Sequence, residues 1–236
     1  MNRWLFLSIL ASSILSGCTV PPVQKVEAQA PLEISVGTQT KPIEFRKILT
    51  KIPLGEQVVK MHYGWGCFPG ANIGWRGGRL NITDEELTET FRSELQSRNY
   101  QVVGDPYALF DDPSVWQAEI LVAGVVTKVD TQVCFPFSGS PSAGIGNTSA
   151  LKGGAFMRVT WQIYGRAAGK VVHEVTTEGS YQSEEVISGG FPIFFRNAFA
   201  ANVRNLLADR GFHDLVVKHN DQQAEPPHQR NGAQGI

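Results

Sequence analysis

The sequence has little cysteine, no excess of either charge and no long hydrophobic run. It contains three cysteines in 236 residues, with 21 basic and 22 acidic side chains. A net charge of −1 argues against a nucleic-acid partner, because binding to phosphates requires a basic face. The apolar run from Trp4 to Leu15 is too short to span a bilayer. Nevertheless, 42% hydrophobic and 18% charged residues are typical of a globular domain with a core.

Catalytic and metal-binding motifs are also missing. There is no Gly-x-Ser-x-Gly elbow, no Gly-x-x-x-x-Gly-Lys-Ser/Thr loop and no His-Glu-x-x-His helix. We expect His173 to be a cross-strand partner, and His213 could act in a dyad only with a nucleophile that the sequence does not reveal. His219 and His228 lie in a polar stretch without further ligands. We therefore expect no catalytic residue, no cofactor and no metal.

The first residues have the pattern of an export signal. Arg3 provides a positive charge, and an apolar run follows it as far as Leu15. The next residues, in the sequence Leu15-Ser16-Gly17-Cys18, resemble the lipobox of bacterial lipoproteins. The resemblance implies that residues 1–17 are a signal peptide and that Cys18 becomes the lipid-bearing first residue of the mature chain. The alternative is an ordinary secreted protein whose signal happens to end at a cysteine.

The lipobox resemblance also implies a location. Two or three acyl chains anchor a protein stably, because each buried methylene contributes about 0.8 kcal/mol. The non-acidic Thr19 after the cysteine favours the periplasmic face of the outer membrane. Residues 18–42 are rich in Pro, Gln, Ala and Thr, which predicts a flexible lipidated tether that reaches roughly 25–30 Å.

Cys67 and Cys134 remain as an even pair once Cys18 carries lipid. In an oxidising periplasm we expect them to form a disulfide bond. Each is followed by Phe-Pro, and proline is typical of the end of a strand. A metal pair would lack neighbouring ligands, and a reactive thiol would lack a basic neighbour.

The pattern between residues 43 and 217 predicts a single α+β domain. The sequence Thr83-Asp-Glu-Glu86 is a capping box that begins a helix with its apolar stripe at Leu87, Phe91 and Leu95. A second helix is predicted from Phe191 to Arg210, capped by Gly211, with Phe199 in its stripe and Asn202 on the flank. Strands are predicted in stretches of alternating apolar and polar residues, at 43–52, 57–63, 100–103, 118–133, 155–164 and 171–181.

These elements predict a mainly antiparallel sheet of five or six strands with two helices packed on one face. Residues 218–236 are polar and contain Pro and Gln, which predicts a disordered tail.

A glycine-rich loop between the second strand and the first helix contains two tryptophans and two arginines. We expect Trp65, Trp75, Arg76 and Arg79 to form a candidate partner-binding loop. The alternative is that the disulfide holds the loop and that the indoles cover the edge of the core.

The region from about Ile52 to Val217 is similar to an uncharacterised proteobacterial envelope domain that is sometimes found N-terminal to a trypsin-like peptidase domain. The matching segments are Leu54–Gly55, Cys67–Gly70, Phe91–Leu95, Tyr100–Pro106, Val159–Tyr164, Val175–Gly179 and Asn197–Ala208. The Gly-Asp-Ser-Gly sequence of such a peptidase does not occur in this chain, so we expect no protease activity. More distantly, the element order resembles the fold of curli-secretion-type lipoproteins.

These observations predict a non-catalytic accessory or scaffold protein in an envelope assembly. Its partners would be the membrane, through the lipid on Cys18, and an envelope protein of unknown identity. One alternative is a regulatory or substrate-presenting module for a separate periplasmic trypsin-like peptidase. Another is a hydrolase whose site is assembled from scattered residues.

Overall fold

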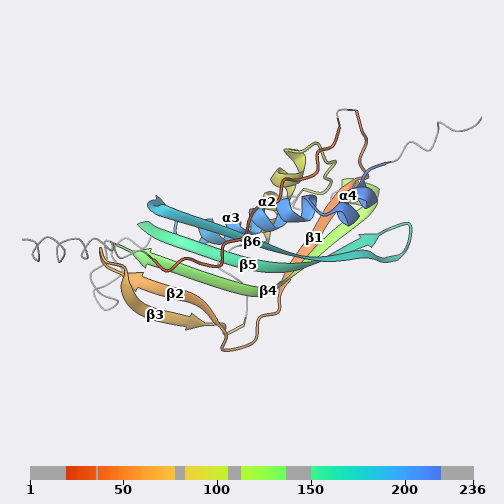
Figure 1. Ribbon diagram of the computed structural model, residues 1–236. Coiled ribbons are helices and arrows are strands. Elements are labelled where there is room, and N and C mark those ends of the chain that lie inside the picture. The colour runs from red at the N-terminus through yellow and green to blue at the C-terminus, as the bar shows by residue number, and fades with distance from the viewer. Residues whose placement is uncertain (1–19, 36, 78–82, 106–112, 137–149, 219–236) are drawn as a thin grey trace, which may run out of the picture.

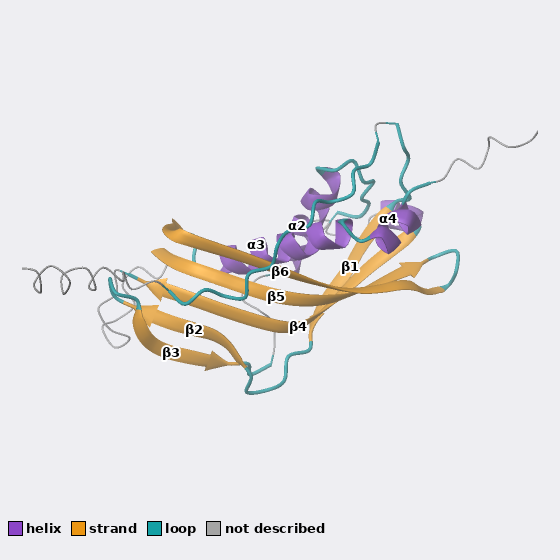
Figure 2. Cartoon of the chain, in the orientation of Figure 1, coloured by secondary structure: helices purple, strands orange, loops and turns teal. Residues whose placement is uncertain are grey.

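A six-stranded sheet carries helices on one face, as Figures 1 and 2 show. The computed structural model describes residues 20–35, 37–77, 83–105, 113–136 and 150–218. The strands are β1 (Ile43–Thr50), β2 (Gln57–Tyr63), β3 (Phe68–Gly74), β4 (Ile120–Phe135), β5 (Ala150–Gly165) and β6 (Lys170–Ser188). The helices are α2 (Asp84–Gln96), α3 (Phe191–Leu207) and α4 (Arg210–Val216), with a 3₁₀ turn at Pro113–Gln117. The predicted α+β class is confirmed.

The long central strand β4 organises the sheet. The strand order is β3-β2-β4-β5-β6, and β1 also pairs with β4. β1 lies parallel to Ile120–Val126, and β2 lies parallel to Thr131–Phe135 further along the same edge. The other neighbouring pairs are antiparallel. Because β4 has 16 residues while β1 has 8 and β2 has 7, both short strands fit end to end along it.

Helix α2 begins where the capping box predicts. The Thr83 hydroxyl accepts a hydrogen bond from the Glu86 amide at 3.1 Å, and the Glu86 carboxylate accepts one from the Thr83 amide at 3.0 Å. After the helix, Asn99 reverses the chain with a φ of 64°. The strand predicted at 100–103 is reduced to an isolated bridge between Val102 and Ile43.

The second predicted helix is two helices in the structure. α3 ends at Leu207, and α4 begins after Asp209, whose carboxylate accepts a hydrogen bond from the Phe212 amide at 2.8 Å. Gly211, predicted to cap the long helix, therefore lies inside α4. A Cβ at this position would lie 2.5 Å from Cε1 of His173, so glycine leaves room for the imidazole ring. α4 makes a third helix where two were predicted.

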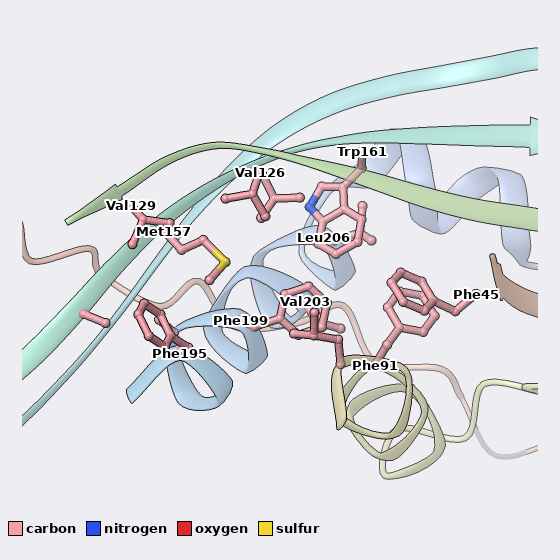
Figure 3. Close-up of a cluster of buried hydrophobic side chains, with 14 of the residues drawn as sticks. Phe45, Phe91, Val126, Val129, Met157, Trp161, Phe195, Phe199, Val203 and Leu206 are labelled. Carbon is pink, nitrogen blue, oxygen red and sulfur yellow. The ribbon is translucent and has the colours of Figure 1, made fainter. Parts of the chain in front are cut away.

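Aromatic side chains fill the space between the helices and the sheet (Figure 3). Phe45 of β1 stacks on Phe91 of α2, with ring centroids 4.6 Å apart. Trp161 of β5 packs on Phe199 of α3 at 5.7 Å. The stripe of α2 predicted from its sequence is buried in this core.

Asn202 of α3 is fully buried, which corrects its predicted place on the flank of the helix. Its Nδ2 donates to the carbonyl oxygens of Met157 and Ala198, each at 3.0 Å. Its Oδ1 accepts from the Thr177 hydroxyl at 3.0 Å, and that hydroxyl accepts from the Trp161 indole at 2.7 Å. Gly179 of β6 makes this close approach possible, because a Cβ there would lie 2.5 Å from the backbone nitrogen of Asn202 and 2.6 Å from its side-chain Nδ2.

The segment predicted as a flexible tether is packed on the domain from residue 20 onward. Val23 contacts the sheet at Gly154, and the Val26 amide donates to the Ser180 hydroxyl at 2.9 Å. Ser180 follows Gly179, which faces α3, so this part of the segment crosses the opposite face of the sheet. Figure 1 shows the segment then passing over β6 to the helices.

The far half of the segment binds helix α3. The Gln29 amide donates to the Asn205 side chain at 2.9 Å, and the Leu32 amide donates to the Leu207 carbonyl at 3.1 Å. The tether prediction is therefore wrong for residues 20–35 and 37–42. An extended segment can bury isolated valines and donate its backbone amides to distant residues without any periodic pattern of its own. Cys18, Thr19 and the tail from 219 to 236 lie outside the described residues.

No helix within the described ranges has both the length and the apolar character to cross a bilayer.

Replacing Phe199 by alanine should lower the free energy of unfolding by about 3–5 kcal/mol, because the buried ring leaves a cavity. This loss is a large part of the roughly 5–15 kcal/mol that a domain typically has. Chemical denaturation measures it. Arg196→Ala, at an exposed position of the same helix, is the matched control and should change stability little. Equal stability losses in the two variants would contradict the described packing of α3.

Candidate functional site

The candidate site lies at the end of the sheet where β2 turns into β3. One backbone hydrogen bond and a disulfide join the turn to the last residues of β4, and a second hydrogen bond lies within the turn. The Gly64 amide donates to the Phe135 carbonyl at 3.0 Å, and the Cys67 amide donates to the Gly64 carbonyl at 3.0 Å. Cys67 and Cys134 form a disulfide with their Cα atoms 5.4 Å apart, which confirms the predicted pair.

The two Cys-Phe-Pro sequences occupy different positions in the sheet. β4 ends at Phe135, directly before Pro136, as predicted. Pro69, in contrast, lies inside β3, which is an edge strand and tolerates a residue without an amide hydrogen.

Two large aromatic side chains project from this turn into solvent. Trp65 is 84% exposed and Phe68 is 55% exposed. Their rings meet edge to face with centroids 6.4 Å apart. Gly66 lies between them, and a Cβ there would come within 2.7 Å of the Phe68 ring, so glycine leaves room for this arrangement. We call Trp65 and Phe68 the aromatic tip.

Further aromatic rings pack next to the turn that carries the tip. Tyr63, at the end of β2, stacks on Phe135 with centroids 5.6 Å apart. Phe135 meets Phe191, the first residue of α3, at 5.7 Å. These ring contacts join β2, β4 and α3 at the end of the sheet where the tip is located.

The first described residue also lies at this end. Val20 is buried and forms a small apolar cluster with Cys67 and Cys134, separate from the main core. The N-terminal segment thus begins on the disulfide, beside the aromatic tip.

The other predicted members of the loop lie elsewhere or outside the described chain. Trp75 is only 9% exposed and belongs to the main core, and its amide donates to the Glu56 carbonyl at 2.7 Å. Arg76 is exposed, and Arg79 lies outside the described residues. Because β3 separates Trp65 from Trp75, the structure does not bring the two indoles together. Trp75 covers the core edge, as the alternative interpretation holds.

Two histidine pairs lie near α4, away from the tip. His173 Nε2 is 2.7 Å from the Asp209 carboxylate, which also caps α4. His173 pairs across the strands with Ile163, as predicted, and its side chain also contacts Asp209, the N-cap residue of α4. His213 Nδ1 is 3.3 Å from the Tyr100 hydroxyl. Burial raises the pKa of Tyr100 to about 12, and the positive charge of Arg98 opposes this shift.

The Asp209 contact could not be found from the sequence, because Asp209 was assigned to the interior of one long helix. Within the described ranges, no group of three or more His, Cys, Asp or Glu side chains is placed to hold a metal ion.

Comparisons with known proteins give distant structural likenesses. No protein-family model matches the chain, and neither does any curated protein sequence. One similar structure is a PelC dodecamer from Paraburkholderia phytofirmans, at 10% identity over 76% of this chain and 93% of that one, with a TM-score of 0.37. Another is a minor lipoprotein from Acinetobacter baumannii, at 11% identity over 75% and 98% of the two chains, with a TM-score of 0.29.

A third similar structure is a protein from Xanthomonas campestris, at 9% identity over 80% of this chain and 92% of that one, with a TM-score of 0.33. At these values the likenesses carry no inference about function. The resemblance to an envelope domain that the sequence motifs indicate stays a prediction.

Non-reducing peptide mapping of the protein, purified from its native host with free thiols blocked, should recover the Cys67 and Cys134 peptides joined. Their separation of 67 residues predicts that the bond contributes about 4 kcal/mol in the chain-entropy model. A Cys67→Ser/Cys134→Ser double variant should accordingly unfold at lower denaturant concentration. Free thiols at both positions in the wild-type protein would contradict the bond.

Stability should depend on Tyr100 at high pH. The pKa of Tyr100 in the folded protein, about 12, is above the ordinary value of 10.0, so the folded state holds this proton more tightly than the unfolded chain does. The resulting stabilisation is present below about pH 10 and is lost as the pH rises to about 12. The melting temperature of the wild type should therefore fall more steeply over this range than that of Tyr100→Phe. Parallel curves would show that the buried phenol makes no such contribution.

Proposed function

We propose that this protein is a lipoprotein anchored through Cys18 to the periplasmic face of the outer membrane, where it is a non-catalytic accessory or scaffold in an envelope assembly. The observation that carries the proposal is the sequence Leu15-Ser16-Gly17-Cys18 at the end of a short apolar run that follows Arg3. A lipid on Cys18 holds the domain at the membrane. Thr19, which is not acidic, favours the outer membrane.

The disulfide supports export to an oxidising compartment. Disulfides form and persist in oxidising compartments such as the bacterial periplasm, and they are rare in the cytosol. The Cys67–Cys134 bond joins the β2–β3 turn to the end of β4, so it contributes to the structure of the sheet and is not at a surface where a redox role is expected.

The contacts of the ionisable side chains favour a scaffold over a hydrolase. Asp209 bonds both His173 and the first turn of α4, which is a structural arrangement. Tyr100 is held protonated by burial beside His213, and a protonated phenol with a pKa of about 12 is a poor nucleophile at neutral pH. By contrast, the side chains of the aromatic tip are exposed in a turn that a disulfide holds, as a binding surface requires.

Lipidation is tested by labelling cells with a fatty acid that can be detected on the protein. The wild type should incorporate the label and stay with the membrane fraction, whereas Cys18→Ser should do neither. Ser16→Ala is the matched control, because alanine is accepted at that position of the lipobox, and it should label like the wild type. Labelling of Cys18→Ser would show that the anchor lies elsewhere.

The scaffold role is tested by affinity purification of the lipidated protein from solubilised membranes. A reproducible envelope partner is expected. Covalent labelling of the purified protein by a serine-hydrolase activity probe would contradict the non-catalytic proposal.

A further inference from the structure

The place where Val20 packs limits where a lipid on Cys18 can be. Val20 is buried against Cys67 and Cys134, at the end of the sheet that carries the aromatic tip. Only Thr19 lies between Cys18 and Val20, and an extended chain advances at most about 7 Å over the two residue steps from one to the other. If Cys18 carries lipid, as the proposed function has it, the anchor is held close to the disulfide.

The aromatic tip is next to this point. Trp65 and Phe68 flank Cys67 in the sequence, in the turn that the disulfide and the hydrogen bonds of Gly64 and Cys67 hold. The exposed Trp116 is a useful contrast, with an exposed fraction of 75%. Trp116 belongs to the 3₁₀ turn at Pro113–Gln117, just before β4, whereas Cys134 is the next-to-last residue of that strand. Trp116 therefore lies toward the opposite end of β4.

Tryptophan and phenylalanine at this position suit a lipid surface. Tryptophan is enriched at the boundary between headgroups and acyl chains, where its indole N–H finds a hydrogen-bond partner, and phenylalanine adds apolar area that is buried there. A short link between an acylated cysteine and a rigid turn presents the same end of the domain to the bilayer at all times. The bilayer would then bury the two exposed rings, and no protein partner would be needed to remove them from water.

We propose that Trp65 and Phe68 insert into the interface of the membrane that holds the Cys18 lipid, and so orient the domain with the long axis of β4 rising from the bilayer. The inference rests on the proposed lipidation for the location of the membrane. It adds a second, non-covalent contact that fixes the orientation of the domain.

The first experiment measures which tryptophan meets lipid. The mature lipidated protein, from which Trp4 has been removed with residues 1–17, is reconstituted into phosphatidylethanolamine and phosphatidylglycerol vesicles whose acyl chains carry bromine, a quencher of tryptophan fluorescence. Trp75 and Trp161 are buried in the core, so quenching reports the exposed indoles. Wild type and Trp116→Phe should be quenched alike, and Trp65→Phe should lose most of the quenching. Quenching that persists in Trp65→Phe or disappears in Trp116→Phe overturns the proposal.

The second experiment separates the tip from the anchor. Mature protein with Cys18→Ser has no lipid, and its binding to the same vesicles without bromine is measured by co-sedimentation. Trp65→Ser/Phe68→Ser should lower the bound fraction about tenfold, since binding scales with the apolar area buried. Trp116→Ser should leave it unchanged. Thermal melting of each variant confirms that these exposed substitutions leave the fold intact.

The outcomes distinguish the proposed function from this inference. If the wild type takes up no fatty acid but Cys18→Ser protein still binds vesicles through Trp65, the anchor assignment fails and the membrane tip stands. If lipidation is confirmed but no Trp65-dependent quenching or binding is found, the tip proposal is wrong. Loss of an envelope partner on Trp65→Ser, without any lipid contact, would likewise assign the tip to protein binding and overturn the proposal.

Discussion

The side-chain amide of Asn202 holds helix α3 at a defined position on the sheet. It is buried completely, and its hydrogen bonds reach a carbonyl of β5, a hydroxyl of β6 and the preceding turn of its own helix. A buried amide without partners costs about 1–3 kcal/mol, so sliding or rotating α3 is strongly disfavoured. Gly179 completes the constraint, because any side chain there would push the helix away.

Other parts of the chain depend on that position of α3. Its Asn205 side chain and Leu207 carbonyl receive the amides of the N-terminal segment. The residues that follow it place Asp209 as the cap of α4 and the partner of His173. At its other end, Phe191 supports the rings beneath the aromatic tip. One polar contact in the core thus influences the arrangement at both ends of the molecule.

Local sequence patterns predicted most helices and strands correctly, but they could not predict the contacts between helices and strands. The capping box located α2, because its hydrogen bonds join residues three apart. Asn202 was misplaced because helical periodicity ranks residues by hydrophobicity, and a buried amide that finds every partner breaks that ranking. The break at Asp209 was missed because the apolar pattern continues through Phe212. The packed N-terminal segment has no periodicity to detect, since its hydrogen bonds go to distant residues.

The candidate site was only partly predictable for a similar reason. The cysteine pair followed from counting and compartment, which need no coordinates. Trp65 and Trp75 have nearly the same glycine-rich surroundings in the sequence, yet one is exposed and the other is buried. The difference arises from the pairing of β3 with β2, which places Trp65 in the turn and returns Trp75 to the core beside Gly55. No local property of either tryptophan encodes that pairing.

The packed N-terminal segment could also lengthen the connection between the N-terminus and the domain if it detached. Detached and extended, residues 20–42 would span about 75 Å. In the structure the described part of the segment instead lies along the domain, from Val20 at the disulfide near the end of β4 to Pro42 beside the start of β4. A steady pull on the N-terminus would load the contacts of this segment one after another, beginning at Val20 and continuing through Val26 and Gln29. Peeling of this kind requires far less force than shearing β1 from β4, where the hydrogen bonds of a parallel ladder are loaded together. The segment would therefore yield first and leave the sheet intact.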